Sequence, residues 1–295
     1  MHPEPQPPIQ RRWWRWITAA LTATALATSA CAGPSSSGGP AATPSSTRAQ
    51  ATTTTAAALE QPSSRCGPPD APATLVGFTA ADGTSLDGVL VGHGRAGVVL
   101  VHEYPADLCG FWPFANYLAK RGLRAFAIDL RCFGRSACPQ GDAKGRVVDD
   151  IAAAVAELRR RGVTRVALVG ASMGGAAVLI AGTRARPPVA AVVSLSGEAD
   201  PTNLVGGIPL DAGAAIKRLK VPAMLVVATG DRYAPVDETR AMYRAVTARD
   251  KELLVLSGPS FDGRHGWNLV TDTVSGQPTS VAAKVAAFLT AHTHR

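Results

Sequence analysis

The stretch RVALVGASMGGAAVLIAGT, residues 165–183, joins a continuous apolar run to a segment rich in alanine and glycine, with a serine at the junction. The apolar run predicts a strand buried on both faces, and we expect a helix from the turn to about Thr183. The junction, Gly170-Ala171-Ser172-Met173-Gly174, has the G-x-S-x-G spacing, in which small residues allow a sharp, strained turn between strand and helix. Such a turn exposes the serine hydroxyl at the helix N-terminus, where the helix dipole favours negative charge. Ser172 is therefore a candidate nucleophile, the alternative being a serine that only caps the helix.

Strand and helix patterns alternate on both sides of this stretch. Period-2 alternation or short apolar runs predict strands at 73–79, 85–92, 97–101, 123–129, 165–169, 189–196, 222–228 and 252–256. Helical periodicity predicts helices at 111–122, 147–161, from the serine turn to 183, at 237–248 and at 278–292. Two antiparallel strands followed by strand–helix units imply an α/β fold with a mostly parallel, mixed sheet of about eight strands and helices on both faces. About 25 residues separate Ser196 from Val221, which is too few for a large cap domain.

A serine hydroxyl of ordinary pKa is a poor nucleophile and needs a base. Three histidines precede the C-terminal tail in the predicted body: His93, His102 and His265. His93 ends the first predicted hairpin, whereas His265 lies in a loop after the last predicted strand, near the carboxyl edge of the sheet. We therefore predict that His265 is the base for Ser172.

An acid that orients this base is expected after an intervening strand. Asp231 follows the seventh predicted strand. Asp237 is better placed to cap the next helix, and Asp262 is so close to His265 in sequence that its carboxylate would rarely meet the imidazole correctly. We therefore predict that Asp231 orients His265.

With the chain order Ser172, Asp231, His265, residues 73–292 resemble the α/β-hydrolase fold family. Three further segments resemble motifs of this family. His102-Glu103-Tyr104 resembles its oxyanion loop, and Gly230-Asp231 with Pro235 resembles its acid turn. Residues 129–136 resemble its Asp-x-Arg-Gly-x-Gly-x-Ser turn, with Cys132 at a position where the motif has glycine.

The resemblance implies acyl transfer, in which Ser172 attacks a carbonyl, His265 takes and returns the proton, and Asp231 holds the imidazole tautomer. The backbone N–H groups of Met173 and Tyr104 would form the oxyanion hole. We expect a carboxylesterase or lipase-like serine hydrolase that uses neither a metal nor a cofactor. A peptidase, amidase or thioesterase with the same three residues stays open. Two non-catalytic alternatives have less support: a binding protein with the same fold, and a surface scaffold.

Glu103 departs from the usual oxyanion loop, which has His-Gly. In the dienelactone hydrolase branch of the family a His-Glu pair occupies this place, and the glutamate interacts with a cysteine nucleophile. Two roles for Glu103 stay open: it points into the pocket and disfavours anionic substrates, or it bonds the adjacent loop. Phe111, Trp112 and Trp267 are candidates for the pocket wall, although such aromatic residues more often belong to the core.

Four cysteines lie in or next to the predicted body: Cys66, Cys109, Cys132 and Cys138. An even number in an exported chain predicts two disulfides. A local Cys132–Cys138 bridge would leave Cys66 to pair with Cys109. Pairing of Cys109 with Cys132 or Cys138 is the alternative.

The amino-terminal residues have the pattern of an export signal. Three arginines and three tryptophans at 11–16 precede an apolar run at 17–27 that is too short to span a bilayer. Ser29-Ala30-Cys31 resembles the cleavage site of a bacterial lipoprotein. We predict a signal peptide at 1–31 and lipidation of Cys31, which would hold the exported protein at the outer face of the cell membrane. Cleavage after Ala30 would instead give a secreted protein.

The segment 32–70 is composed mainly of Ala, Ser, Thr, Gly and Pro, so it cannot bury enough apolar surface to offset backbone ordering. We predict a disordered tether here and a catalytic domain at 71–295. The formal net charge is +8, but the basic residues of the body are scattered. We therefore expect a small or lipid-like acyl substrate, and no binding to nucleic acid.

Overall fold

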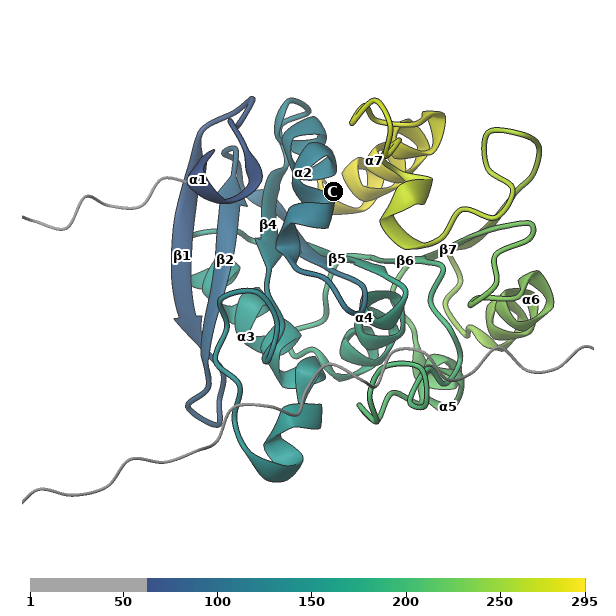
Figure 1. The fold of residues 1–295 in the computed structure, drawn as a ribbon, viewed down its shortest axis with the longest axis horizontal. Helices are drawn as coiled ribbons and strands as arrows, with labels where there is room; N and C mark the ends of the chain where they lie inside the picture. The colour runs from purple at the N-terminus through teal and green to yellow at the C-terminus, as the bar shows by residue number, and fades with distance from the viewer. Residues whose placement is uncertain (1–62, 295) are drawn as a thin grey trace, which may run out of the picture. The chain divides into compact units, whose positions relative to one another are not determined.

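A mixed sheet is the framework of the protein, whose computed structural model describes residues 63–294 (Figure 1). The eight strands lie in the order β1-β2-β4-β3-β5-β6-β7-β8. β1 pairs antiparallel with β2 and β2 with β4, whereas all other neighbours pair in parallel. The strands are β1 (Ala73–Thr79), β2 (Ser85–Val91), β3 (Ala96–Val101), β4 (Arg124–Ile128), β5 (Arg165–Ala171), β6 (Val192–Leu195), β7 (Ala223–Ala228) and β8 (Lys251–Leu256). This sheet confirms the predicted fold class.

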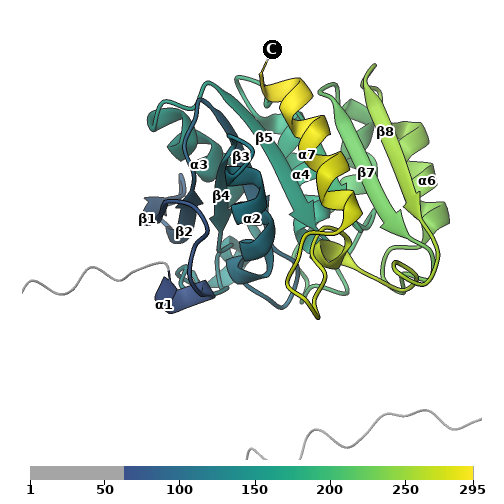
Figure 2. The same cartoon turned by 90° about the horizontal axis from the view of Figure 1, so that it is seen from above.

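Helices cover both faces of the sheet (Figure 2). α2 (Trp112–Ala119) and α7 (Ser280–Thr293) pack on one face. α3 (Val147–Arg160), α4 (Met173–Arg184) and α6 (Val236–Ala245) pack on the other. The apolar stripe of α3 at Ile151, Val155 and Leu158 is buried, as its spacing predicts. Within residues 63–294, no helix has the length and apolar character needed to cross a membrane.

Two predicted elements are much shorter in the structure than their patterns indicate. The strand predicted at 189–196 is β6, which ends before Ser196, where a φ of 51° turns the chain out of the sheet. The helix predicted at 111–122 is α2, and Gly122 with a φ of 80° follows its end. Between β6 and β7 lie only α5 (Ala212–Ala215) and a 3₁₀ turn (Ile216–Arg218), so this segment forms no large cap domain.

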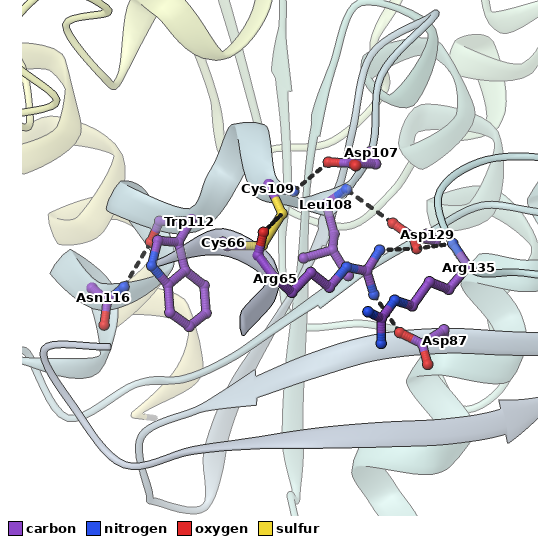
Figure 3. The surroundings of a disulfide bond; sticks show 10 residues. All are labelled: Arg65, Cys66, Asp87, Asp107, Leu108, Cys109, Trp112, Asn116, Asp129 and Arg135. Atoms are coloured by element: carbon purple, nitrogen blue, oxygen red, sulfur yellow. Dashed lines mark hydrogen bonds and ion pairs between the residues drawn. A yellow bond between two sulfur atoms is a disulfide. The ribbon is translucent and has the colours of Figure 1, made fainter. Parts of the chain in front are cut away.

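The described part of the chain begins with the short helix α1 (Ser63–Cys66), which is fastened to the body (Figure 3). Cys66 is paired with Cys109 in η1 (Leu108–Phe111), the 3₁₀ turn that follows β3. Arg65 forms ion pairs with Asp87 on β2 and with Asp129 after β4. Residues 63–66, which the sequence assigned to the tether, are therefore helical and linked to the body. The predicted signal peptide, Cys31 and the tether up to residue 62 lie outside the described residues.

The turn after β4 takes the shape that its motif requires. Cys132, which stands in a glycine place, has a φ of 67° in the left-handed region and is paired with Cys138. At Gly134 a Cβ atom would lie 2.0 Å from the Asp129 carboxylate, so a side chain does not fit there. Asp129 accepts hydrogen bonds from the backbone N–H of Leu108, at 3.0 Å, and of Arg135, at 2.7 Å. The carboxylate thereby ties this turn to the loop after β3.

Candidate active site

Ser172 stands between β5 and α4, at the sharp turn that the sequence predicts. Its φ of 48° and ψ of −117° are strained for a residue with a side chain, at a cost of about 1–3 kcal/mol. The turn is possible because glycines stand two residues before and two residues after Ser172: a Cβ at Gly174 would lie 2.2 Å from the Val101 carbonyl oxygen, and one at Gly170 would lie 2.0 Å from that of Gly174. Close packing of strand, turn and helix therefore fixes the serine in this position.

His265 and Asp231 meet at the same edge of the sheet. Nδ1 of His265 lies 2.9 Å from each carboxylate oxygen of Asp231. Asp231 follows β7, and the backbone N–H groups of Tyr233 and Ala234 donate hydrogen bonds of 3.0 and 3.1 Å to its Oδ1. The carboxylate is therefore held in place while it faces the imidazole.

The pair stabilises the ionised carboxylate and the imidazolium. Burial alone would raise the pKa of Asp231, but hydrogen bonds from His265 and the backbone outweigh burial, and the pKa lies below its ordinary value. Burial alone would lower the pKa of His265, but the hydrogen bond and charge of Asp231 outweigh it, and the pKa lies above its ordinary value. The imidazole is thus a stronger base than an isolated buried histidine.

The other candidate acids lie elsewhere. Asp262 is hydrogen-bonded to the Thr229 hydroxyl and to the backbone N–H of Gly258. Asp237 lies in the first turn of α6 and contacts Arg240 at 3.2 Å, but it does not cap the helix as predicted, because the N-cap residue is Pro235 and no side chain caps this end.

His102 has a structural environment. It is fully buried, and its Nε2 accepts a hydrogen bond of 3.1 Å from the backbone N–H of Leu130. Its Nδ1 lies 2.8 Å from the Glu103 carbonyl oxygen. Both ring nitrogens are therefore engaged in joining the loops after β3 and β4.

The hydroxyl of Ser172 has a partner that sequence reasoning missed. Ser172 Oγ donates a hydrogen bond of 3.1 Å to Oε1 of Glu198, and the same Oε1 lies 4.0 Å from Nε2 of His265. The structure therefore brings the candidate nucleophile and base to one carboxylate oxygen. Glu198 is the first charged residue after β6, and this position at the carboxyl edge was the only signal in the sequence.

Glu103 bonds the loop that carries His265. Its Oε2 accepts a hydrogen bond of 3.3 Å from the backbone N–H of Trp267, and a Cβ at Gly266 would lie 1.7 Å from that oxygen. Burial raises the pKa of Glu103 to about 7. This hydrogen bond agrees with the second of its two predicted roles, a contact with the adjacent loop.

The two predicted oxyanion donors follow the neighbouring parallel strands β5 and β3. Met173 is the first residue of α4, so its N–H is one of the amino-terminal groups without an intrahelical acceptor. Tyr104 follows Glu103 in the loop after β3, and its ring meets that of Phe133 edge-on, with centroids 5.8 Å apart.

A cleft of about 840 Å³ adjoins the site. It is lined by Tyr104, Phe133, Lys144, Val205, Ile208 and Trp267, among others. Trp267, two residues after His265, contributes to the wall of this cleft. Phe111 and Trp112 do not line the cleft. They lie in the core, 0% and 7% exposed, with Phe111 at the end of η1 and Trp112 at the start of α2.

Several known proteins are similar in sequence to this chain, in some cases over about 70% of its length. The family described as "Serine aminopeptidase, S33" matches residues 92–211. The uncharacterized protein YfhR of Salmonella typhimurium is 27% identical over 243 residues, which are 70% of this chain and 82% of that protein. The AB hydrolase superfamily protein YisY of Bacillus subtilis is 36% identical over 87 residues, 29% of this chain and 31% of that protein.

Solved structures share the whole architecture. The esterase Pf2001 of Pyrococcus furiosus superposes with a TM-score of 0.62 at 20% identity, covering 76% of this chain and 93% of that one. The enol-lactonase of Burkholderia xenovorans gives a TM-score of 0.59 at 17% identity, covering 72% and 99%. Strand order, the serine turn and these likenesses define the α/β-hydrolase fold. The chain therefore has the α/β-hydrolase fold.

Proposed function

We propose that this protein is a serine hydrolase that cleaves carboxylic esters through an acyl-enzyme intermediate. The observation that carries the proposal is the contact of His265 Nδ1 with both oxygens of Asp231, at 2.9 Å, beside the strained turn of Ser172. A buried carboxylate on Nδ1 leaves Nε2 as the nitrogen that can accept a proton.

In the proposed acylation step, the Ser172 hydroxyl turns from Glu198 toward His265. Oγ attacks the ester carbonyl carbon while Nε2 of His265 accepts its proton. The backbone N–H groups of Met173 and Tyr104 are the proposed donors to the oxyanion, each worth about 2.7–4 kcal/mol in enzymes of this kind. His265 then protonates the leaving alkoxide, and the alcohol departs.

Deacylation reverses these roles with water in place of the alcohol. His265 accepts a proton from water as the water oxygen attacks the acyl-enzyme carbonyl, and it returns the proton to Oγ of Ser172 as the carboxylic acid leaves. Asp231 stays ionised throughout and stabilises the imidazolium in each step.

Esters are the proposed substrates because several solved structures with this architecture are named esterases. Amides and thioesters react through the same steps, and the matched family is described as a serine aminopeptidase. A peptidase, amidase or thioesterase is therefore the second candidate.

We expect an alkyl fluorophosphonate probe to label the full chain at Ser172, since the probe phosphonylates only an activated serine. Peptide mass mapping of the labelled protein identifies the modified residue. A panel of short p-nitrophenyl esters, thioesters and peptide anilides should show the highest kcat/KM for the esters. Labelling at another residue would contradict the assignment of the nucleophile, and faster turnover of the anilides would favour the peptidase alternative.

We further propose that the protein is exported and anchored in the outer face of the cell membrane by a lipid on Cys31. The support is the sequence pattern at 1–31, a basic stretch, a short apolar run and Ser29-Ala30-Cys31. Cells grown with radiolabelled palmitate should yield labelled wild-type protein, and Cys31→Ala should abolish the label. Ser29→Ala serves as the control, because it keeps the cysteine. An unlabelled wild-type protein recovered from the medium would show secretion instead.

A further inference from the structure

Glu198 is held beside the reacting hydroxyl by the residues on either side of it. Gly197 packs against the first turn of α4, where an added Cβ would lie 2.7 Å from the carbonyl carbon of Gly175. The backbone N–H of Ala199 donates a hydrogen bond of 2.6 Å to the carboxylate of Glu238 on α6. The side chain of Glu198 is 5% exposed and therefore has a defined place in the site.

The carboxylate of Glu198 can accept more hydrogen bonds than the protein offers it. Oε1 accepts one hydrogen bond, of 3.1 Å, from the hydroxyl of Ser172. Oε2 is buried and has no hydrogen-bond partner among the protein groups of residues 63–294. Buried polar atoms without a partner are rare in proteins, and each calls for an explanation. A donor that takes part in the reaction would provide one.

Formation of an acyl-enzyme removes the one donor of Oε1. Once Oγ of Ser172 is bonded to the acyl carbon, it carries no hydrogen and cannot donate. The protein then offers no donor to either oxygen of Glu198, at the stage at which water must reach the acyl carbon. Because a buried acceptor without a donor is costly, the acyl-enzyme favours a reactant that has a proton to share with Glu198.

His265 and Glu198 are spaced so that one water molecule can contact both. Nε2 of His265 lies 4.0 Å from Oε1 of Glu198. Two hydrogen bonds of about 2.8 Å from one water oxygen, at an angle of about 90–105°, end about 4.0–4.4 Å apart. Oγ of Ser172, which would carry the acyl group, lies 3.1 Å from the same Oε1. A water that bridges His265 and Glu198 is therefore beside the carbonyl carbon.

We propose that Glu198 is a positioning residue for deacylation, which orients the hydrolytic water and thereby favours hydrolysis over acyl transfer to an alcohol. One water proton passes to Nε2 of His265 as the water oxygen bonds to the carbonyl carbon. The other proton stays on that oxygen and donates to the Glu198 carboxylate. It leaves with the carboxylic acid when the bond from carbon to Oγ of Ser172 breaks and Oγ takes the proton from His265. This inference rests on the proposed serine hydrolase function.

An alcohol lacks the second proton that this arrangement uses. Its single hydroxyl proton passes to His265, so an attacking alcohol has none to donate to Glu198. Removal of the carboxylate should therefore slow the attack of water more than the attack of an alcohol.

The products formed from p-nitrophenyl butyrate in aqueous methanol test the proposal. Water and methanol compete for one acyl-enzyme, so the ratio of methyl butyrate to butyric acid compares the two acceptors directly. A change in acylation rate or in the basicity of His265 acts on both products and cancels in the ratio. In full-length E198M, which keeps the side-chain length without a carboxylate, this ratio should be at least about tenfold above wild type. In E198Q, whose neutral amide oxygen is a weaker acceptor, it should be about fivefold above wild type.

E252Q is the matched control, since Glu252 is exposed on β8, and it should keep the wild-type product ratio. Fluorophosphonate labelling of Ser172 in each variant verifies that the nucleophile is intact. If labelled E198M and E198Q both keep the wild-type ratio, the positioning role is wrong and the serine hydrolase function stands. If E198M does not fold, the ratio in E198Q alone decides. If the wild type neither reacts with the probe nor consumes the ester, both proposals fail.

Discussion

Replacing Ser172 with alanine is expected to lower kcat for short p-nitrophenyl esters by about 10⁶-fold and to abolish fluorophosphonate labelling. The reason is that Oγ forms the covalent bond to the acyl group, and the alanine methyl group cannot replace it. The fold should persist, because the hydroxyl contributes one hydrogen bond, to Glu198, whereas the turn is held by its flanking glycines. Initial rates and circular dichroism on the same preparation provide the measurement.

Ser280→Ala is the matched control for this variant. Ser280 is exposed in the first turn of α7, so its replacement should leave both labelling and hydrolysis near the wild-type level. Residual hydrolysis above about one percent of wild type in a folded Ser172→Ala protein would point to another nucleophile, since removal of an acylated serine costs far more than a hundredfold.

Replacing Asp231 with asparagine is expected to lower kcat by about 10⁴-fold with little change in geometry. The asparagine amide can donate to Nδ1 of His265, which favours the tautomer with its proton on Nε2, and that nitrogen can no longer accept the proton of Ser172. Asp237→Asn is the control, because Asp237 is an exposed residue of α6 whose side chain contacts Arg240. Equal losses in both variants would contradict the assignment of Asp231.

The pH dependence gives this variant a second readout. His265 must be neutral to accept a proton, so the rate falls as the pH drops below the pKa of His265. In the wild type the hydrogen bond and charge of Asp231 hold this pKa above its ordinary value. Without them, only the charges of Glu103 and Glu198 still oppose burial, so the pKa of His265 falls. The acid limb of the pH–rate profile should therefore move to lower pH in Asp231→Asn.

Most of the fold could be predicted because its strands are short apolar runs between turn residues. β3, β5 and β7 are each buried along their whole length, and this is what a continuous apolar run indicates. The same logic gave the candidate site, since parallel strands end at one edge of the sheet and Ser172, Asp231 and His265 each follow a strand.

What the sequence could not provide was the distance between side chains. Glu198 belongs to no motif, and only the structure shows that it contacts Ser172. Phe111 and Trp112 were candidates for the pocket wall, although such residues more often belong to the core, and in the structure both are buried in the core. The cysteine pairing stayed open because spacing along the chain does not say which loops lie side by side.

The link between Cys66 and Cys109 also determines how the body would bear a mechanical load. A pull on the chain ahead of residue 63 reaches this crosslink and the ion pairs of Arg65 before it reaches β1. β1 lies at the edge of the sheet and is joined to it only through β2, so an unprotected pull would peel it away one hydrogen bond at a time. The force passes instead into the loop after β3 and from there into the middle of the sheet.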